Sequence, residues 1–105
     1  MLIYHVVLPE VWEHFRTRPS YRAESLQSEG FIHCSYESQL EGVLKRYYSE
    51  VDRVFILSID TAKLLPKLVE EPSTNGEMFP HIYGRINRNS VVEVKERNLM
   101  QAAVA

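Results

Sequence analysis

The segment from residue 54 to residue 59, VFILSI, is nearly continuous in apolar side chains and constrains the fold more than any other. It is too short for a typical isolated helix, and its β-branched and aromatic residues favour an extended conformation. Because apolar and polar residues do not alternate along it, the segment is predicted to be a strand buried on both faces. We therefore expect a sheet with this strand in a central position.

A second strand is expected almost at the first residue. Leu2–Val7 is short and contains β-branched and aromatic residues, which favour an extended conformation. Successive side chains of a strand point to opposite faces, so Ile3, His5 and Val7 are predicted to share one face. A histidine is thus expected among apolar neighbours.

Three more strands are predicted further along the chain. Residues 31–35 follow a glycine and are read as a short strand. Residues 81–86 and 91–95 are predicted to close the sheet. The Asn-Arg-Asn-Ser sequence at 87–90 offers turn chemistry, so these two strands are expected to form a hairpin.

Periodic apolar residues predict helices in the first half of the chain. One helix is expected from Pro9, which suits a first turn, and another after Ser35 as its N-cap. A short helix is also expected from Pro19 and Ser20, ending at Gly30. The apolar sets that carry the two longer helices are Leu8, Val11, Trp12 and Phe15, and then Leu40, Val43, Leu44, Tyr47, Tyr48 and Val51.

The distribution of these elements predicts an α+β fold with a mixed or antiparallel sheet. Asp60 is expected to cap a short turn that runs to Leu65, and residues 70–78 have the composition of an exposed loop. A chain of 105 residues suits one domain over 1–105. Residues after about 99 are expected to fray.

Charge and composition exclude several classes of partner. The 12 basic and 14 acidic residues give a net charge of -2, and they are mixed along the chain, so no field for long nucleic acid is expected. No apolar run approaches the roughly 20 residues of a membrane helix. The single cysteine, Cys34, fits a reducing compartment. A cytoplasmic protein is the default expectation.

Three of the four histidines, His5, His33 and His81, fall in predicted strands or at their edges. A near-neutral pKa suits histidine to proton transfer or substrate binding, although any one of them could instead bond a backbone carbonyl for purely structural reasons. Alternation puts His33 and Ser35 on one face and Cys34 on the other. Ser35 therefore has two candidate roles, in a site and as a helix cap.

The segment FPHIYG at 79–84 carries the other candidate groups. His81 and Tyr83 are predicted to share a face, and Gly84 permits close approach of the backbone. Glu70, Glu71 and Glu77 in the preceding loop could each bring a carboxylate to a cleft or serve solubility alone, and Glu77, two residues before Phe79, is the preferred candidate. His14 is interpreted as a surface residue.

A metal site is the competing use of three histidines. The chain contains no HxH, HExxH or CxxC spacing, so a zinc site would need ligands from three distant segments. We therefore predict no metal.

YHVV at 4–7, EGFIHCS at 29–35 followed by Gln39, LSID at 57–60 and FPHIYG at 79–84 together resemble the family called domain of unknown function 952. The resemblance spans nearly the whole chain and implies a compact, divergent ADP-ribosyltransferase-like fold, in which a split β-sheet holds a nicotinamide dinucleotide in a cleft. It implies no established activity.

The resemblance also implies roles for particular residues. His5 matches the position that holds the nicotinamide ribose, and Ser35 or His33 matches the second-strand position. His81 stands where active transferases keep a glutamate, which argues against protein ADP-ribosylation unless Glu77 enters the cleft. Some relatives of the fold, the RNA 2'-phosphotransferases, use histidine and arginine instead.

The leading hypothesis is a cleft that binds NAD, ADP-ribose or a related nucleotide, with transfer or hydrolysis at the ribosyl bond. No cofactor is required, and NAD is a candidate substrate or ligand. The alternatives are a non-catalytic domain that senses a small molecule or nucleotide, and an interaction role for the loop at 70–78. The candidate catalytic residues are His5, His33, Ser35, His81 and Glu77, and the candidate substrate-binding residues are Trp12, Phe31, Tyr83 and Gly84.

Overall fold

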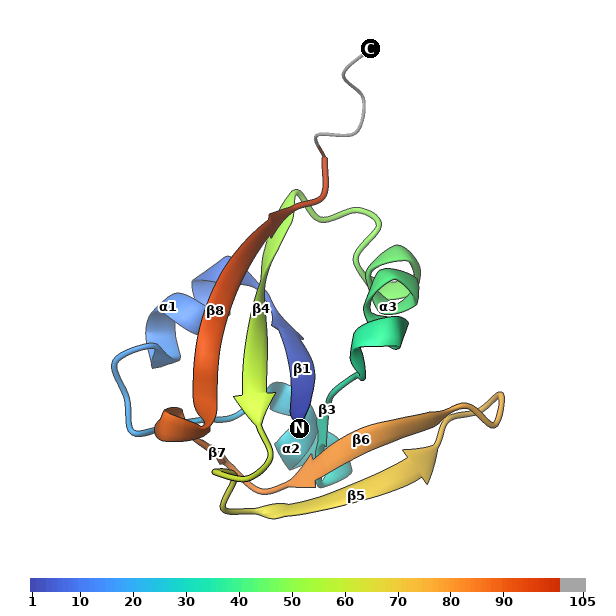
Figure 1. The fold of residues 1–105 in the computed structure, drawn as a ribbon. Helices are drawn as coiled ribbons and strands as arrows, with labels where there is room; N and C mark the ends of the chain where they lie inside the picture. The colour runs from blue at the N-terminus through green and yellow to red at the C-terminus, as the bar shows by residue number, and fades with distance from the viewer. Residues whose placement is uncertain (101–105) are drawn as a thin grey trace.

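The computed structural model describes residues 1–100, which form two three-stranded sheets and a two-stranded ribbon (Figure 1). The strand orders are β1-β4-β8, β3-β6-β5 and β2-β7, and all pairings between these strands are antiparallel. The strands are β1 (Leu2–Val7), β2 (Ser20–Tyr21), β3 (Ile32–His33), β4 (Arg53–Asp60), β5 (Lys67–Pro72), β6 (Met78–Tyr83), β7 (Ile86–Asn87) and β8 (Val91–Asn98). The helices are α1 (Pro9–Phe15), α2 (Glu24–Glu29) and α3 (Leu40–Tyr47), with 3₁₀ turns η1 (Glu37–Gln39) and η2 (Arg88–Ser90).

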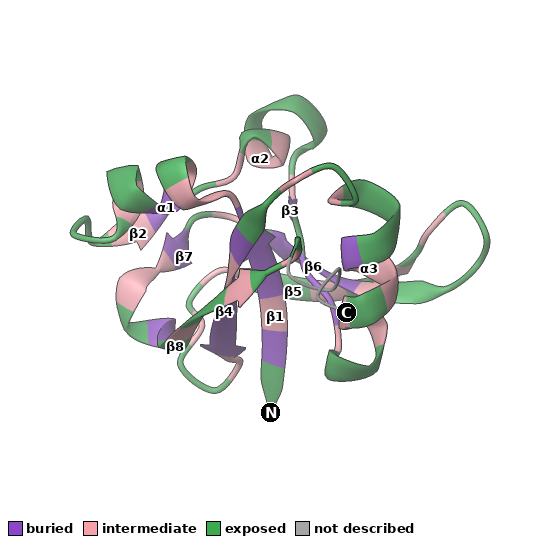
Figure 2. Ribbon diagram, turned by 90° about the horizontal axis from the view of Figure 1, so that it is seen from above, coloured by how far each residue is buried: buried purple, intermediate pink, exposed green. Residues whose placement is uncertain are grey.

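The first sheet confirms the central strand. β4 pairs with β1 on one side and with β8 on the other, and Val54 and Leu57 are fully buried. Phe55, Leu57 and Ile59 pack into one cluster with Ile3 and Trp12, whereas Val54 and Ile56 pack into another with Leu44. Figure 2 shows the buried residues concentrated on β1 and β4, between α1 and α3. The segment 54–59 of this strand is apolar except for Ser58 because helices cover both of its faces.

Residues 70–78 do not form the expected loop. β5 and β6 are a hairpin in which Glu70 lies opposite Pro80 and Pro72 lies opposite Met78. Only the turn around Gly76 is irregular, with its backbone N–H donating to the carbonyl of Ser73 at 2.9 Å. The prediction was wrong because β5 is an edge strand, and an edge strand tolerates charged residues and proline that a central strand excludes.

A two-residue bridge joins the two large sheets. The backbone N–H of Tyr4 donates to the Ser35 carbonyl at 2.8 Å, and the N–H of Ser35 donates to the Tyr4 carbonyl at 2.7 Å. Ser35 is therefore not the N-cap that we expected, because its backbone continues the extended chain. The cap position of η1 belongs to Tyr36, whose N–H donates to Oε1 of Gln39 at 2.9 Å.

Two other predicted connections differ in the structure. The second helix begins at Glu24 rather than at Pro19, because Ser20 and Tyr21 pair with β7, and it ends as expected at Gly30, where φ is 90°. Residues 81–86 and 91–95 do not pair as a hairpin: β6 lies between β3 and β5, and β8 pairs with β4. The chain between them enters the ribbon at β7 and the turn η2.

The structure is an α+β protein with antiparallel sheets and with its helices mostly in the first half. In the described part, no helix is long and apolar enough to cross a membrane. The expectation of fraying after residue 99 concerns mainly residues 101–105, which lie outside the described part of the chain.

Candidate functional site

Aromatic rings gather on one face of the second sheet. His33 and His81 are directly opposite each other on β3 and β6, so their side chains emerge on the same side. Their ring centroids are 5.2 Å apart in an edge-on arrangement. The Phe31 ring stacks on His81 at 4.1 Å with an interplanar angle of 17°. The sheet therefore presents a compact surface of three rings.

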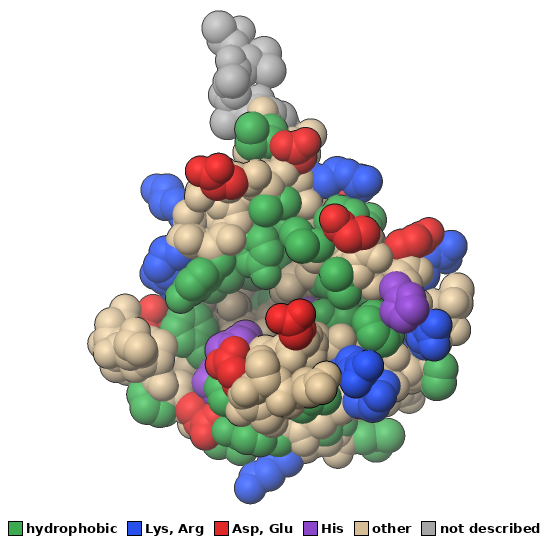
Figure 3. All heavy atoms as spheres, turned by 180° about the vertical axis from the view of Figure 1, so that it is seen from behind, with side chains coloured by type: hydrophobic (Ala, Val, Ile, Leu, Met, Phe, Trp, Pro, Cys, Tyr) green, Lys and Arg blue, Asp and Glu red, His purple; other side chains and the backbone are tan. Residues whose placement is uncertain are grey.

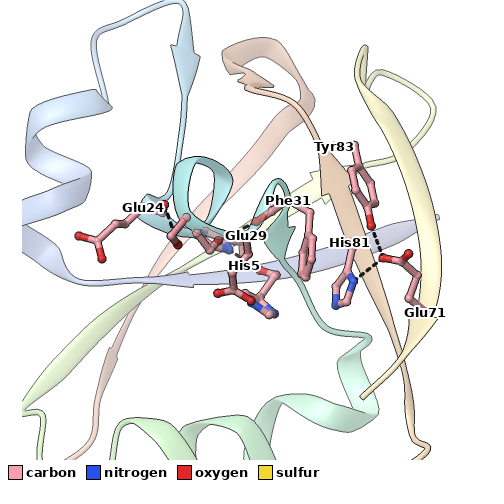
Figure 4. A network of polar contacts seen from close by, with 10 residues as sticks. His5, Glu24, Glu29, Phe31, Glu71, His81 and Tyr83 are labelled. Carbon is pink, nitrogen blue, oxygen red and sulfur yellow. Dashed lines mark hydrogen bonds and ion pairs between the residues drawn. The ribbon is translucent and has the colours of Figure 1, made fainter. Parts of the chain in front are cut away.

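Glu71 joins this surface from the edge strand. Val69 is the direct partner of His81, so Glu71, two residues further along β5, lies on the same face and diagonal to it. Its Oε1 accepts hydrogen bonds from Tyr83 Oη at 2.6 Å and from His81 Nδ1 at 2.7 Å. Figure 4 shows Glu71 reaching toward both residues, with Phe31 beside the His81 ring. The hydrogen bond from Tyr83 lowers the pKa of Glu71 most, and the hydrogen bond from His81 lowers it further. The carboxylate therefore stays charged.

This contact determines which nitrogen of His81 is available. An ionised carboxylate only accepts hydrogen bonds, so Nδ1 carries a proton, and it is Nε2 that has a free lone pair whenever the ring is neutral. Nε2 of His81 makes no hydrogen bond to any residue from 1 to 100, and no buried polar side-chain atom in that range lacks a partner. Nε2 is therefore open to the surface, although only 10% of the side chain is exposed. A carboxylate–histidine pair with a free Nε2 is the arrangement needed for a general base.

His33 is the more exposed member of the pair. Its Nε2 is 3.2 Å from Oε1 of Glu29 at the end of α2, and more than half of its side chain is accessible. Its ring also meets the Phe31 ring edge-on at 4.9 Å. His33 thus has its own acidic neighbour and a position beside the His81 ring.

His5 does not join these rings at the surface. It is buried, and both of its nitrogens are bonded: Nδ1 to the His33 carbonyl at 2.7 Å and Nε2 to Tyr21 Oη at 2.8 Å. Burial lowers the pKa of His5 to about 4, so the ring is neutral near pH 7, with Nδ1 donating and Nε2 accepting. Burial also raises the pKa of Tyr21, which keeps its hydroxyl proton for that bond. His5 supports the backbone of His33 from inside the core.

Three other predicted site residues have clear structural surroundings. Ser35 is buried at the bridge to β1. Trp12 is buried in the core, with the Arg88 guanidinium 5.2 Å from its ring centroid. At Gly84, an added Cβ would lie 2.7 Å from Cβ of Pro66, so the close approach that we expected is made by the protein itself. Cys34 is buried in the core, and burial raises the pKa of its thiol.

Glu77 and Gln39 tie the hairpin β5–β6 to η1 at the border of the site. Gln39 Nε2 donates to Glu77 Oε2 at 3.1 Å and to the Met78 carbonyl at 2.8 Å. Beside it, Tyr36 Oη donates to Glu70 Oε2 at 2.6 Å, which raises the pKa of Tyr36 to about 12. Figure 3 shows the surface hollowed near the centre of one face, with histidine and acidic side chains at the edge of the hollow. Glu77 therefore holds the hairpin, while Glu71 contacts His81.

Sequence reasoning counted Glu71 among the loop acids but preferred Glu77, and it missed Glu29 as the partner of His33. Once 67–72 and 78–83 are recognised as a hairpin, alternation alone puts Glu71 on the face of His81 and Tyr83. Glu29 precedes His33 by four residues. That spacing predicts a side-chain contact only within one helix, and here the helix ends at Gly30 before His33. Among residues 1–100, no group of three or more histidine, cysteine or acidic side chains is arranged to hold a metal ion.

Comparisons with known proteins agree on the fold. The sequence family described as "Protein of unknown function (DUF952)" matches residues 6–94. The crystal structure of CC0527 from Caulobacter crescentus superposes with a TM-score of 0.82 at 22% identity, covering 91% of this chain and 85% of that chain. The solution structure of CC0527 gives a TM-score of 0.75 at 22% identity, with 92% and 83% covered. No curated protein matches the chain.

Proposed function

We propose that this chain, which belongs to the DUF952 family, binds NAD, ADP-ribose or a related nucleotide at the surface of Phe31, His33, His81 and Tyr83. We further propose that the pair Glu71–His81 supplies the general base for transfer or hydrolysis at the ribosyl bond. The observation that carries the proposal is the His81 ring, held through Nδ1 by Glu71 with Nε2 open to the surface.

The reaction assigns one step to each group. An acceptor oxygen, from water or a hydroxyl, attacks the ribosyl carbon, and the bond to nicotinamide breaks with its electron pair leaving on nicotinamide. His81 Nε2 takes the proton of the attacking oxygen. The charge of Glu71 stabilises the imidazolium that results, because an opposite charge within hydrogen-bond distance favours the protonated ring.

Three observations support this ligand class. Phe31 and Tyr83 have ring centroids 5.5 Å apart beside His81, and aromatic faces stack well on nucleobases and nicotinamide. Two separate sheets meet at the bridge between Tyr4 and Ser35, which agrees with the split sheet that the family resemblance implies. Glu71 brings a carboxylate beside the position where histidine replaces the expected glutamate.

The proposal is tested by offering NAD to the purified protein and measuring free nicotinamide. We expect turnover by the wild type, and a loss of at least about 100-fold in His81→Gln, which is the usual contribution of a general base. The matched control is Glu93→Gln on β8, an exposed residue outside the site, which should retain turnover. Equal turnover in wild type and His81→Gln would overturn the catalytic assignment.

A non-catalytic binding domain is the second candidate, favoured by the small exposed fraction of His81, 10% of its side chain. It predicts binding of NAD, ADP-ribose or a nucleotide with no release of nicotinamide. A binding titration with the same panel therefore separates the two candidates. Absence of binding to every member would reject both.

A further inference from the structure

A second cluster of side chains lies outside the site described above, on the ribbon β2–β7. Tyr21 pairs with Ile86 and Ser20 with Asn87, and Arg22 and Arg85 flank the Tyr21–Ile86 pair just outside the paired residues. Tyr21 and Ile86 point into the core, each at most 2% exposed. Arg22 and Arg85 are instead exposed, and both line the same hollow.

Two like charges that share one hollow repel each other. Neither Arg22 nor Arg85 makes an ion pair or a side-chain hydrogen bond with any residue from 1 to 100. The chain as a whole carries a net charge of -2, so carboxylates are available elsewhere in the sequence but are not used here. An anion between the two guanidinium groups would remove the repulsion.

The surroundings of the two arginines have the shape and the charge of an anion site. They line a hollow of about 270 Å³ together with Arg18, His14 and Ser20, and no acidic residue lines it. Arg18 uses only its Nε–H, which donates to the His14 carbonyl at 3.1 Å. Figure 3 shows basic side chains gathered about a histidine at one edge of the face that carries the central hollow.

We propose that this hollow, formed by Arg18, Arg22 and Arg85 with His14 and Ser20, binds a phosphate or pyrophosphate group of a small molecule. The fork of N–H groups on each guanidinium matches two phosphate oxygens at once. Ser20 adds a hydroxyl donor, and His14 adds one ring N–H. The three positive charges of the arginines exceed the single negative charge of a carboxylate. They match better a group that carries two or more negative charges.

The ligand is a compact group rather than a polymer. The seven lining residues come from the α1–β2 region and from the single position Arg85, so the basic surface is local. A nucleic-acid backbone needs a row of phosphate contacts, and the mixed charge of the chain does not provide one. This inference is independent of the function proposed above, because it rests on residues that do not contact His81.

The test is a titration of amide resonances with inorganic phosphate, pyrophosphate and adenosine diphosphate, at constant ionic strength maintained with chloride. We expect saturable shifts at residues 18, 20–22 and 85, and at least a roughly tenfold weaker affinity in Arg85→Gln and in Arg22→Gln. Arg46→Gln, on the exposed side of α3, is the matched control and should bind as the wild type does. No saturable shift at these residues, or equal affinity in all the variants, would overturn the proposal.

Thermal unfolding in phosphate-free buffer gives a second readout and checks that the variants fold. Arg85→Gln and Arg22→Gln should each melt at or above the wild-type midpoint, because the like-charge contact is removed, and should lose the rise in midpoint that phosphate produces in the wild type. A wild-type midpoint unchanged by phosphate would also count against the site. Saturation by inorganic phosphate alone assigns a free-phosphate site, and tighter binding of adenosine diphosphate assigns a nucleotide site.

Discussion

Glu71 and His81 are two residues out of direct register on β5 and β6, yet their side chains are joined by a hydrogen bond of 2.7 Å. Diagonal neighbours across paired strands are within reach of long and aromatic side chains, and Glu71 uses that reach to bond His81 and Tyr83 with one oxygen. Its second oxygen makes no hydrogen bond to the residues from 1 to 100. The hairpin thereby sets both the tautomer and the orientation of the imidazole.

Glu71→Gln should reduce activity more than it reduces stability. The amide can still accept the Nδ1–H, but it supplies no charge to stabilise an imidazolium, so turnover of NAD should fall by about tenfold or more. Glu71 is partly exposed, and the thermal midpoint should stay within a few degrees. Circular dichroism melting and nicotinamide release measure the two effects. A variant with full turnover would show that the charge of Glu71 has no catalytic role.

His5 should make stability depend on pH between about 4 and 6.5. Burial lowers its pKa to about 4, so between these values the unfolded chain binds a proton that the folded chain does not. The contribution of His5 to the free energy of unfolding is therefore fully present above pH 6.5. It is lost as the pH drops toward 4, by on the order of 3 kcal/mol in all. Glu71, whose pKa is lowered from 4.5, affects stability only below about pH 4.5, so the range from 4.5 to 6.5 is free of its contribution.

Urea unfolding at several pH values measures this dependence. His5→Gln should lower stability at pH 7 and flatten the slope between pH 4.5 and 6.5, whereas His14→Gln, on the exposed face of α1, should leave the slope unchanged. If His5→Gln has the same slope as the wild type, His5 is not the group that titrates.

Tyr21→Phe should destabilise the fold because it removes only the hydroxyl group of Tyr21. The ring packs edge-on against Phe15 at 5.2 Å and is retained in the variant, but the hydroxyl that donates to His5 Nε2 is lost. A buried acceptor without its donor costs about 1–3 kcal/mol. Tyr47→Phe is the control, since its side chain is 71% exposed and should change stability little. Chemical denaturation of both variants provides the comparison.

Gly84→Ala and Gly42→Ala should have opposite effects. A Cβ at Gly84 would lie 2.7 Å from Cβ of Pro66, and relieving that overlap should cost on the order of 1–3 kcal/mol. At Gly42, inside α3, the nearest atom is the mobile end of Arg46 at 3.7 Å, so alanine should stabilise by about 0.5–1 kcal/mol. Melting curves of the two variants decide the signs, and a stabilised Gly84→Ala would refute the packing argument.

Local periodicity was sufficient for the elements at the centre of the fold. The predicted strand Leu2–Val7 and the helix that begins at Pro9 are present with those bounds, and the strand predicted at 54–59 lies within β4. Asp60 caps the following turn, as expected, by accepting the N–H of Ala62 at 3.0 Å. These features depend on which side chains are apolar and on short-range hydrogen bonds, and both can be read within a few residues.

The partners of the candidate site residues were decided by the tertiary structure. Alternation indicated that His5 shares a face with Ile3 and Val7, and that face is the one that packs into the core. The sequence of a strand does not show whether other elements pack on a given face. A histidine on that face can therefore be interpreted either as a ligand-binding residue or as a core residue. The contact with Tyr21, sixteen residues away, settles its surroundings.

What the sequence by itself determined is the set of chemical groups, the central strand and the helices in the first half of the chain. What only the tertiary structure decided is which groups meet. Glu71 meets His81 across a hairpin whose edge strand has the composition of a loop, and Arg22 and Arg85 share a hollow beside the ribbon β2–β7 although they are far apart in the chain. The physical reason is register. Strand pairing is set by backbone hydrogen bonds between distant segments, and a shift of one residue would exchange every side chain between the two faces.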